Sequence, residues 1–173
     1  MVFIQRSSFD IRKDVVLLAR DLHIEEAKEK ASTLTGHNAE IGWGAIAVGI
    51  ALRGQDGAKE KAMEAIEHIR NSIFKTNMFR YIALAFASSQ QLEIAREVVL
   101  EKFEKKISKI DIVLSQLELA AKNIDPRSLK DRVQRHQYPL KYRTSNVVTW
   151  KEDFFHSMRQ EVHLIKARTG FNC

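Results

Sequence analysis

Apolar side chains recur every three or four residues along most of this chain, the spacing that places them on one face of an α-helix. Short breaks containing glycine or polar residues separate these amphipathic stretches. The pattern predicts successive helices over residues 10–20, 24–34, 39–53, 58–70, 77–89, 91–107 and 110–124. Because the breaks are short, consecutive helices are expected to fold back on one another as pairs, the first pair joined near Leu22 and His23.

One predicted helix contains an uncharged stretch, WGAIAVGIAL at residues 43–52, between Glu40 and Arg53. A helix that spans a bilayer needs about 20 apolar residues, so this stretch is too short to cross a membrane. A helix that is apolar over most of its circumference is instead covered by other helices. The stretch is therefore predicted to belong to the first helix of a pair, covered by its partner and by the next pair, with Trp43 buried. The small residues that would let its neighbours approach are Gly42, Gly44, Ala47, Gly49 and Ala51.

Two of the breaks carry residues typical of turns. TGHN at 35–38 contains Gly36 and Asn38, which tolerate a left-handed backbone, and the next helix is expected from about residue 39. GQDG at 54–57 predicts a tight turn with Asp56 as the N-cap of the following helix.

Composition agrees with a helical protein. The chain has 173 residues, of which 45% are hydrophobic, and only two prolines and seven glycines, so one all-α domain with a sizeable core is expected. A single cysteine, Cys173, allows no internal disulfide and no cysteine cage for a metal. The first residues lack the apolar core of a signal peptide. Together these features predict a cytoplasmic protein.

The helix pairs show a repeated spacing. Trp43, Ile46, Ala47 and Ile50 are matched 36 residues later by a second set, which consists of Phe79, Ile82, Ala83 and Phe86. Each set is followed by an alanine in the next helix, Ala58 or Ala95. This pattern resembles the tetratricopeptide repeat family over about residues 11–107, with a weaker first unit at Ile11, Val15, Leu18 and Ala27. The sequence departs from the family at Asp14 and Lys102 and lacks the proline that often closes a unit.

The resemblance implies an array of stacked antiparallel helical hairpins whose first helices line a concave wall. The family uses that wall to hold an extended peptide or a partner helix. Position by position, the resemblance places partner-binding residues at Asn77, Arg80 and Leu84 in one unit and at Ile41, Gly44 and Val48 in the unit before it. The alternative is that the C-terminal extension folds back and fills this groove.

That extension begins after residue 124. Asp125 and Pro126 form a helix start that leads into a short helix at 127–136. Residues 137–150 predict a loop or short strand, and 151–168 predict an amphipathic helix. The side chains that would pack this last helix against the array are Phe154, Phe155, Met158, Val162 and Ile165. The chain is thus divided into an array at 1–124 and a basic segment with a terminal helix at 125–173, within one compact domain.

Positive charge is concentrated in the extension. Between Arg127 and Lys151 there are seven basic residues and one acid, a balance of +6 that equals the net charge of the whole chain. Tyr138, Tyr142 and Trp150 lie among them. Basic residues with aromatic rings suit single-stranded nucleic acid, an acidic protein surface, or a connector whose rings anchor it to the fold. The candidate binding residues are Arg127, Lys130, Arg132, Arg135, Lys141, Tyr142 and Arg143.

Catalytic and metal-binding patterns are weak. His156 and His163 lie seven residues apart with Glu152 nearby, whereas zinc enzymes favour a spacing of three or four. Arg159 and His163 suggest a helical ribonuclease, but their spacing is shorter than usual for that family. GQDGAKEK lacks the end of a phosphate-binding loop. No catalytic residue, metal or cofactor is therefore predicted.

These features predict an all-α array of stacked helical hairpins, similar to a tetratricopeptide solenoid, with a basic C-terminal extension. The predicted function is a non-enzymatic adaptor, regulator or inhibitor that binds a protein partner through the array and a basic arm. The alternatives are a nucleic-acid-binding regulator that uses residues 127–151 and, less favoured, a helical ribonuclease. No membrane association is expected, and the sequence indicates neither the oligomeric state nor the identity of the partner.

Overall fold

The computed structural model describes residues 7–103, 107–124 and 150–160, and for 107–112 it describes the backbone alone. Within these ranges every regular element is an α-helix and no strand occurs, which confirms the all-α prediction. The helices are α1 (Ser8–Arg20), α2 (Ile24–Ala31), α3 (Gly36–Arg53), α4 (Ala58–Glu67), α5 (Ser72–Ser88), α6 (Leu92–Phe103), α7 (Ile107–Ala121) and α9 (Trp150–Gln160).

Most helix ends lie within a few residues of the predicted positions, but α3, α5 and α7 begin three to five residues earlier. α5 begins at Ser72 because Asn71 caps it: its side-chain oxygen accepts a hydrogen bond from the backbone N–H of Phe74 at 3.0 Å. α3 begins at Gly36, with Thr35 as its extended N-cap residue, and Gly36 has a left-handed backbone with a φ of 57°. The predicted helix at 127–136 and most of the predicted loop at 137–150 lie outside the described residues.

The turn between α3 and α4 differs from the prediction in its cap. Gly57, and not Asp56, is the N-cap residue of α4, and no side chain caps this helix. Gly57 has a φ of 72°, a left-handed conformation that glycine adopts without steric cost. The requirement for that backbone conformation explains why glycine holds the position.

Alternate helices end in the same kind of turn. Shortly after α1, α3, α5 and α7 one residue has a left-handed backbone: Leu22 (φ 63°), Gly54 (61°), Gln90 (67°) and Asn123 (56°). In three of these turns the next residue donates its N–H to the carbonyl five positions earlier, from His23 to Leu18 (2.8 Å), Gln91 to Phe86 (2.9 Å) and Ile124 to Leu119 (2.9 Å). This bond defines the Schellman end of a helix. One local mechanism therefore reverses the chain repeatedly.

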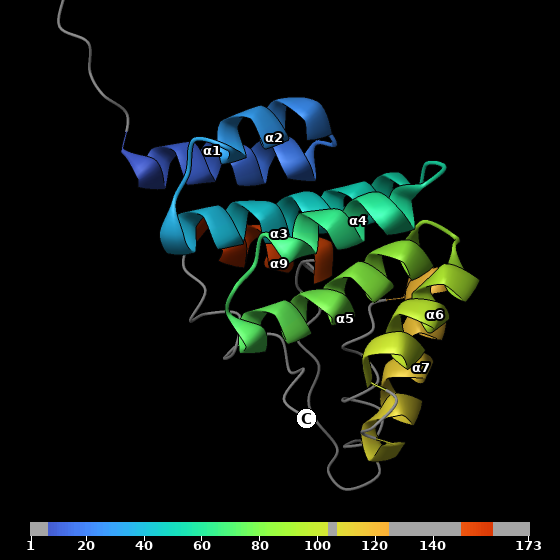
Figure 1. Ribbon diagram of the computed structural model, residues 1–173. Coiled ribbons are helices and arrows are strands. Elements are labelled where there is room, and N and C mark those ends of the chain that lie inside the picture. The colour runs from blue at the N-terminus through green and yellow to red at the C-terminus, as the bar shows by residue number, and fades with distance from the viewer. Residues whose placement is uncertain (1–6, 104–106, 125–149, 161–173) are drawn as a thin grey trace, which may run out of the picture.

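The helices stack in sequence order (Figure 1). α1, α3, α5 and α7 form a row in which each helix packs against the next. α2 packs against α1, α4 against α3, and α6 against α5, so each forms a pair with the helix that precedes it. α9 packs against α1 and α3 and lies behind α3 in the view of Figure 1.

α3 is covered by other helices, as the uncharged stretch predicts. It contacts α1, α2, α4, α5 and α9, and residues 44–51 are all buried. A Cβ added to Gly49 would lie 2.6 Å from the backbone oxygen of Ala19, and one added to Gly44 would lie 3.0 Å from Met78 and 3.1 Å from Met158. The glycines therefore set how closely α1, α5 and α9 approach α3. No helix in the described ranges is long and apolar enough to span a bilayer.

Trp43 and Phe79, the aromatic residues of the repeated spacing, differ in burial. Each is the eighth residue of its helix, and each contacts the end of the second helix in its own pair. The Trp43 ring stacks on His68 with centroids 3.8 Å apart, and the Lys102 ammonium lies 5.1 Å from the Phe79 centroid. Phe79 is buried, whereas Trp43 is only partly buried, so the prediction of a buried Trp43 is met only in part.

Polar side chains in the turn between α5 and α6 tie neighbouring pairs together. Three of them donate to carbonyl oxygens at the ends of α3 and α7: Ser89 to Ala51 (3.0 Å), Gln91 to Gly54 (2.8 Å) and Gln90 to Ala121 (2.9 Å). These bonds satisfy carbonyls that have no partner within their own helix. The turn thus fixes the spacing of three successive helices in the row.

Candidate functional site

The main candidate site is the inner surface, defined here as the faces of α1, α3 and α5 that meet α9. From α5, the Tyr81 ring lies 4.6 Å from Phe154 and 6.4 Å from Trp150, measured between centroids. From α3, Gly44 leaves room for Met158. The inner surface is therefore occupied by a helix of the same chain.

α9 is amphipathic, and its apolar side is the one that is covered. Trp150, Phe154, Phe155 and Met158 are buried, while Glu152, His156 and Gln160 are exposed. Phe154 and Phe155 also contact each other edge to face, with centroids 5.0 Å apart. Phe154, Phe155 and Met158 are thus buried, whereas Val162 and Ile165, the other residues expected to pack this helix, lie outside the described residues.

Arg12 holds the C-terminal end of α9. Its guanidinium donates to the backbone oxygens of Arg159 at 3.1 Å and Gln160 at 3.4 Å, and to the side-chain oxygen of Asn38 at 3.0 Å. Arg159 and Gln160 are the last residues of α9 that the structure describes. Arg12 is itself buried, so these bonds form away from water. It thereby joins α1, α3 and α9.

The residues predicted to bind a partner are placed mainly in the interior. Ile41, Val48 and Leu84 are at most 1% exposed, so no partner reaches them in this structure. Asn77 and Arg80 are half-buried, and the Arg80 guanidinium lies 5.3 Å from the centroid of Phe103. In the described ranges, the inner surface is covered by α9, which packs against α1 and α3. The physical reason is the apolar face of α9, which needs a surface to bury it.

Trp150 does not serve the role considered for it in nucleic acid binding. Its ring is buried against Tyr81, so it offers no free face on which a base could stack. Trp150 instead belongs to the buried side of α9. The predicted basic-segment residues, Arg127, Lys130, Arg132, Arg135, Lys141, Tyr142 and Arg143, lie outside the described residues.

The structure describes only some of the residues considered for metal binding and catalysis. In the part of the chain that the structure describes, no three His, Cys, Asp or Glu residues are grouped as metal ligands. His156 is exposed on α9, and His163 lies outside the described ranges. The geometry therefore adds no support to the zinc or ribonuclease interpretations.

Ion pairs join α4 and α6 on the outer surface, the name used here for the solvent-exposed faces of these two helices. The Lys59 ammonium lies 2.8 Å from Glu101 and 3.0 Å from Glu97. The hydrogen bond to Glu101, more than that to Glu97, raises the pKa of Lys59, while the hydrogen bond from Lys75 lowers the pKa of Glu67. All three contacts are exposed to solvent, where ion pairs contribute little to stability. They mark a solvated face.

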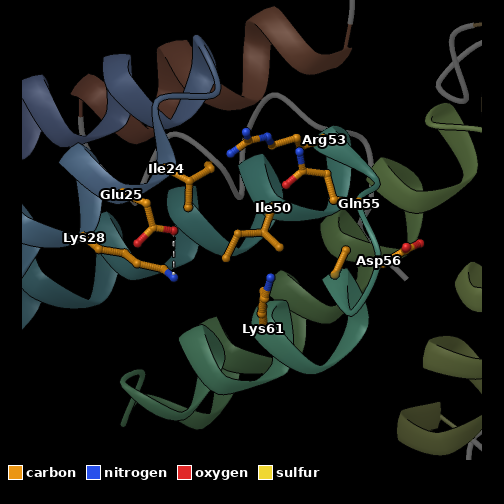
Figure 2. A pocket seen from close by; sticks show the side chains of 9 residues that line it. Ile24, Glu25, Lys28, Ile50, Arg53, Gln55, Asp56 and Lys61 are labelled. Atoms are coloured by element: carbon orange, nitrogen blue, oxygen red, sulfur yellow. Dashed lines mark hydrogen bonds and ion pairs between the residues drawn. The ribbon is translucent and has the colours of Figure 1, made fainter.

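A small hollow lies between α2, the end of α3 and the start of α4 (Figure 2). Its floor is formed by the apolar side chains of Ile24 and Ile50. Three cations stand around this floor: Lys28, Arg53 and Lys61. The hollow therefore combines an apolar base with a cationic rim.

Comparisons with known proteins identify no relative: no family model, no curated protein and no solved structure matches this chain. Its function is therefore argued from the geometry and the charge distribution.

Sequence reasoning missed Arg12 and the hollow. Arg12 reads as an ordinary surface cation of an amphipathic helix, and nothing near it in sequence signals its partners 147 and 148 positions away. The cations of the hollow come from three helices that are separated along the chain. A local pattern does not reveal such groups.

Proposed function

We propose that this chain is a non-enzymatic adaptor or regulator of another protein, built on a tetratricopeptide-like array of helical hairpins with a basic arm at residues 127–151. Two repeated features support the array. α3 and α5 begin 36 residues apart, as the spacing of Trp43 and Phe79 requires, and α1, α3, α5 and α7 end in the same left-handed turn. Stacked hairpins of this kind present extended binding surfaces.

The observation that carries the proposal is the seating of α9 on the inner surface. An array of helices that buries an amphipathic helix by its apolar face and holds its C-terminal carbonyls uses the helix-in-groove mode of peptide recognition. Here the chain supplies that helix itself. The partner is accordingly expected to bind elsewhere, at the half-buried Asn77 and Arg80 and at the basic arm.

Charge indicates the chemistry of the partner. The described ranges contain 17 Lys and Arg and 18 Asp and Glu, so the helical body is close to neutral and the excess positive charge lies in the other segments. A concentrated positive charge attracts an acidic partner and raises the rate of association. Because Trp150 is buried, one of the three rings considered for base stacking is not available. We therefore favour an acidic protein over nucleic acid.

The test uses the full chain and a variant with a neutral arm, Arg132→Gln, Arg135→Gln, Lys141→Gln and Arg143→Gln. The purified chain is used to retain partners from extracts of its own cell, with and without nuclease. We expect a partner in stoichiometric amount that survives nuclease, dissociates at high salt and is lost with the neutral-arm variant.

A control variant removes four cations from the helical body: Lys13→Gln, Arg70→Gln, Lys102→Gln and Lys122→Gln. It should keep the partner, because the body is not the source of the positive field. Oligonucleotide binding that weakens steeply with salt and needs the arm would replace the proposal with the nucleic-acid alternative. Loss of the partner with both variants would contradict a specific role for the arm.

A further inference from the structure

The hollow between α2, α3 and α4 has an unusual balance of charge. Lys28 is paired with Glu25, whose carboxylate lies 3.4 Å from the Lys28 nitrogen. In the described part of the chain, no carboxylate forms an ion pair with Arg53 or Lys61. By contrast, Lys59 on the same helix as Lys61 has two carboxylate partners. Within the described ranges, two cations that face the hollow thus have no carboxylate in ion-pair contact.

The shape of the hollow adds an apolar element. Ile24 and Ile50 are buried and form its floor, and Figure 2 shows the charged groups of Lys28, Arg53 and Lys61 placed around Ile50. Asp56 also lines the hollow, but its side chain extends away from these three groups in Figure 2. A ligand that enters would therefore meet cations at the rim and methyl groups at the base.

We propose that this hollow is a subsite for one acidic side chain, a glutamate or aspartate, of a partner protein. Three cations and two carboxylates leave a local balance of one positive charge, which a single carboxylate neutralises and a phosphate dianion exceeds. Arg53 offers the planar fork that pairs with carboxylates, and Lys61 offers a second donor. The short aliphatic stem of the acidic residue lies over Ile50. This deepens the proposed function, on which it rests, by assigning part of the acidic partner to α2–α4.

The test uses defined peptides on the full chain with the neutral arm, so that the arm does not compete. Backbone amide shifts over residues 53–61 are followed by NMR during titration with a capped hexaglutamate peptide, a capped hexaglutamine peptide and inorganic phosphate at equal ionic strength. We expect saturable shifts at these amides with hexaglutamate alone. Because binding is read at the hollow, its outcome does not depend on whether a cellular partner is found.

Variants then assign the contacts. Arg53→Gln and Lys61→Gln should each weaken hexaglutamate binding about fivefold, since each removes one charged hydrogen bond at an exposed site. Arg53→Lys, which keeps the charge but loses the fork, should fall between Arg53→Gln and the parent. Arg70→Gln is the matched control and should change binding less than about twofold, as a distant exposed charge does.

Three results would overturn the proposal. The first is the absence of shifts at 53–61 with hexaglutamate. The second is an equal effect of Arg70→Gln, which would mean attraction to net charge without a subsite. The third is an equal response to phosphate, which would make the hollow a general anion site.

Discussion

The inner surface and the outer surface of the array both join helices that are distant in sequence, but they do so by different physics. At the inner surface, four large apolar side chains of α9 are buried against α1, α3 and α5. At the outer surface, Lys59 of α4 meets Glu97 and Glu101 of α6 across solvent. A buried aromatic side chain removes roughly 150–250 Å² from water, at about 25 cal/mol per Å², whereas an exposed ion pair contributes about 0–1 kcal/mol.

This contrast separates what holds the fold together from what is free to change. The inner surface should tolerate little substitution, because each apolar group is surrounded by neighbours. The outer surface should tolerate the loss of single charges. It follows that α9 belongs to the core of the array. Displacing α9 would lose far more stabilising free energy than a new contact at an exposed surface could provide. A partner is therefore expected to bind without removing α9.

The largest expected effect is at Phe154. Phe154→Ala removes a fully buried ring between Tyr81 and Phe155, and should lower the free energy of unfolding by about 3–5 kcal/mol. The measurement is urea denaturation followed by circular dichroism. His156→Ala, an exposed position on the same helix, should change stability by less than about 0.5 kcal/mol. Equal effects of the two substitutions would show that α9 is not packed as described.

A second prediction concerns Arg12. Arg12→Met keeps the aliphatic stem but removes the donors to the end of α9 and to Asn38, and should destabilise the fold by about 2–3 kcal/mol. Hydrogen exchange should show that the last turn of α9 loses protection first. Arg20→Gln, which breaks only an exposed pair with Asp21, is the control. Unchanged protection in α9 would contradict the role assigned to Arg12.

Two glycines of α3 sharpen the comparison within the core. A Cβ on Gly49 would lie 2.6 Å from a backbone oxygen, which cannot move easily, whereas a Cβ on Gly42 would lie 3.2 Å from a side-chain carbon of Val15. Alanine also favours a helix over glycine by about 1 kcal/mol. Gly49→Ala should therefore destabilise by about 1–3 kcal/mol, and Gly42→Ala should be near neutral. Thermal melting of both variants distinguishes backbone contact from side-chain contact.

The smallest effect is expected at the outer surface. The Lys59 ion pairs stabilise the folded state only while the lysine is charged. Folding raises the pKa of Lys59 above its ordinary value of 10.5, so this stabilisation is lost as pH rises above 10.5. The pair of Glu67 with Lys75 is lost as pH falls below 4.5, because folding lowers the pKa of Glu67. Lys59→Gln and Glu67→Gln should each cost less than about 1 kcal/mol near neutral pH, and less at high salt. A larger, salt-independent loss would indicate a buried role for these charges.

The repeated turns show which backbone conformations a local sequence pattern can predict and which it cannot. Gly54 is recognisable from sequence because glycine favours a left-handed backbone, but Leu22, Gln90 and Asn123 adopt the same conformation without glycine. The start of α5 was also within reach, since Asn71 is a typical cap. The partial burial of Trp43 could not be predicted from the sequence, because it depends on where α4 ends and where the His68 ring lies.

By itself the sequence determined the helices, their pairing, the burial of α3 and the apolar face of α9, because these follow from periodicity and from small residues that act locally. Only the tertiary structure decided that α9 fills the inner surface, that Arg12 holds its end, and that Lys28, Arg53 and Lys61 meet at one hollow. The reason is that such contacts depend on distances between helices far apart in the chain. Packing of the whole array, and no single stretch of sequence, sets those distances.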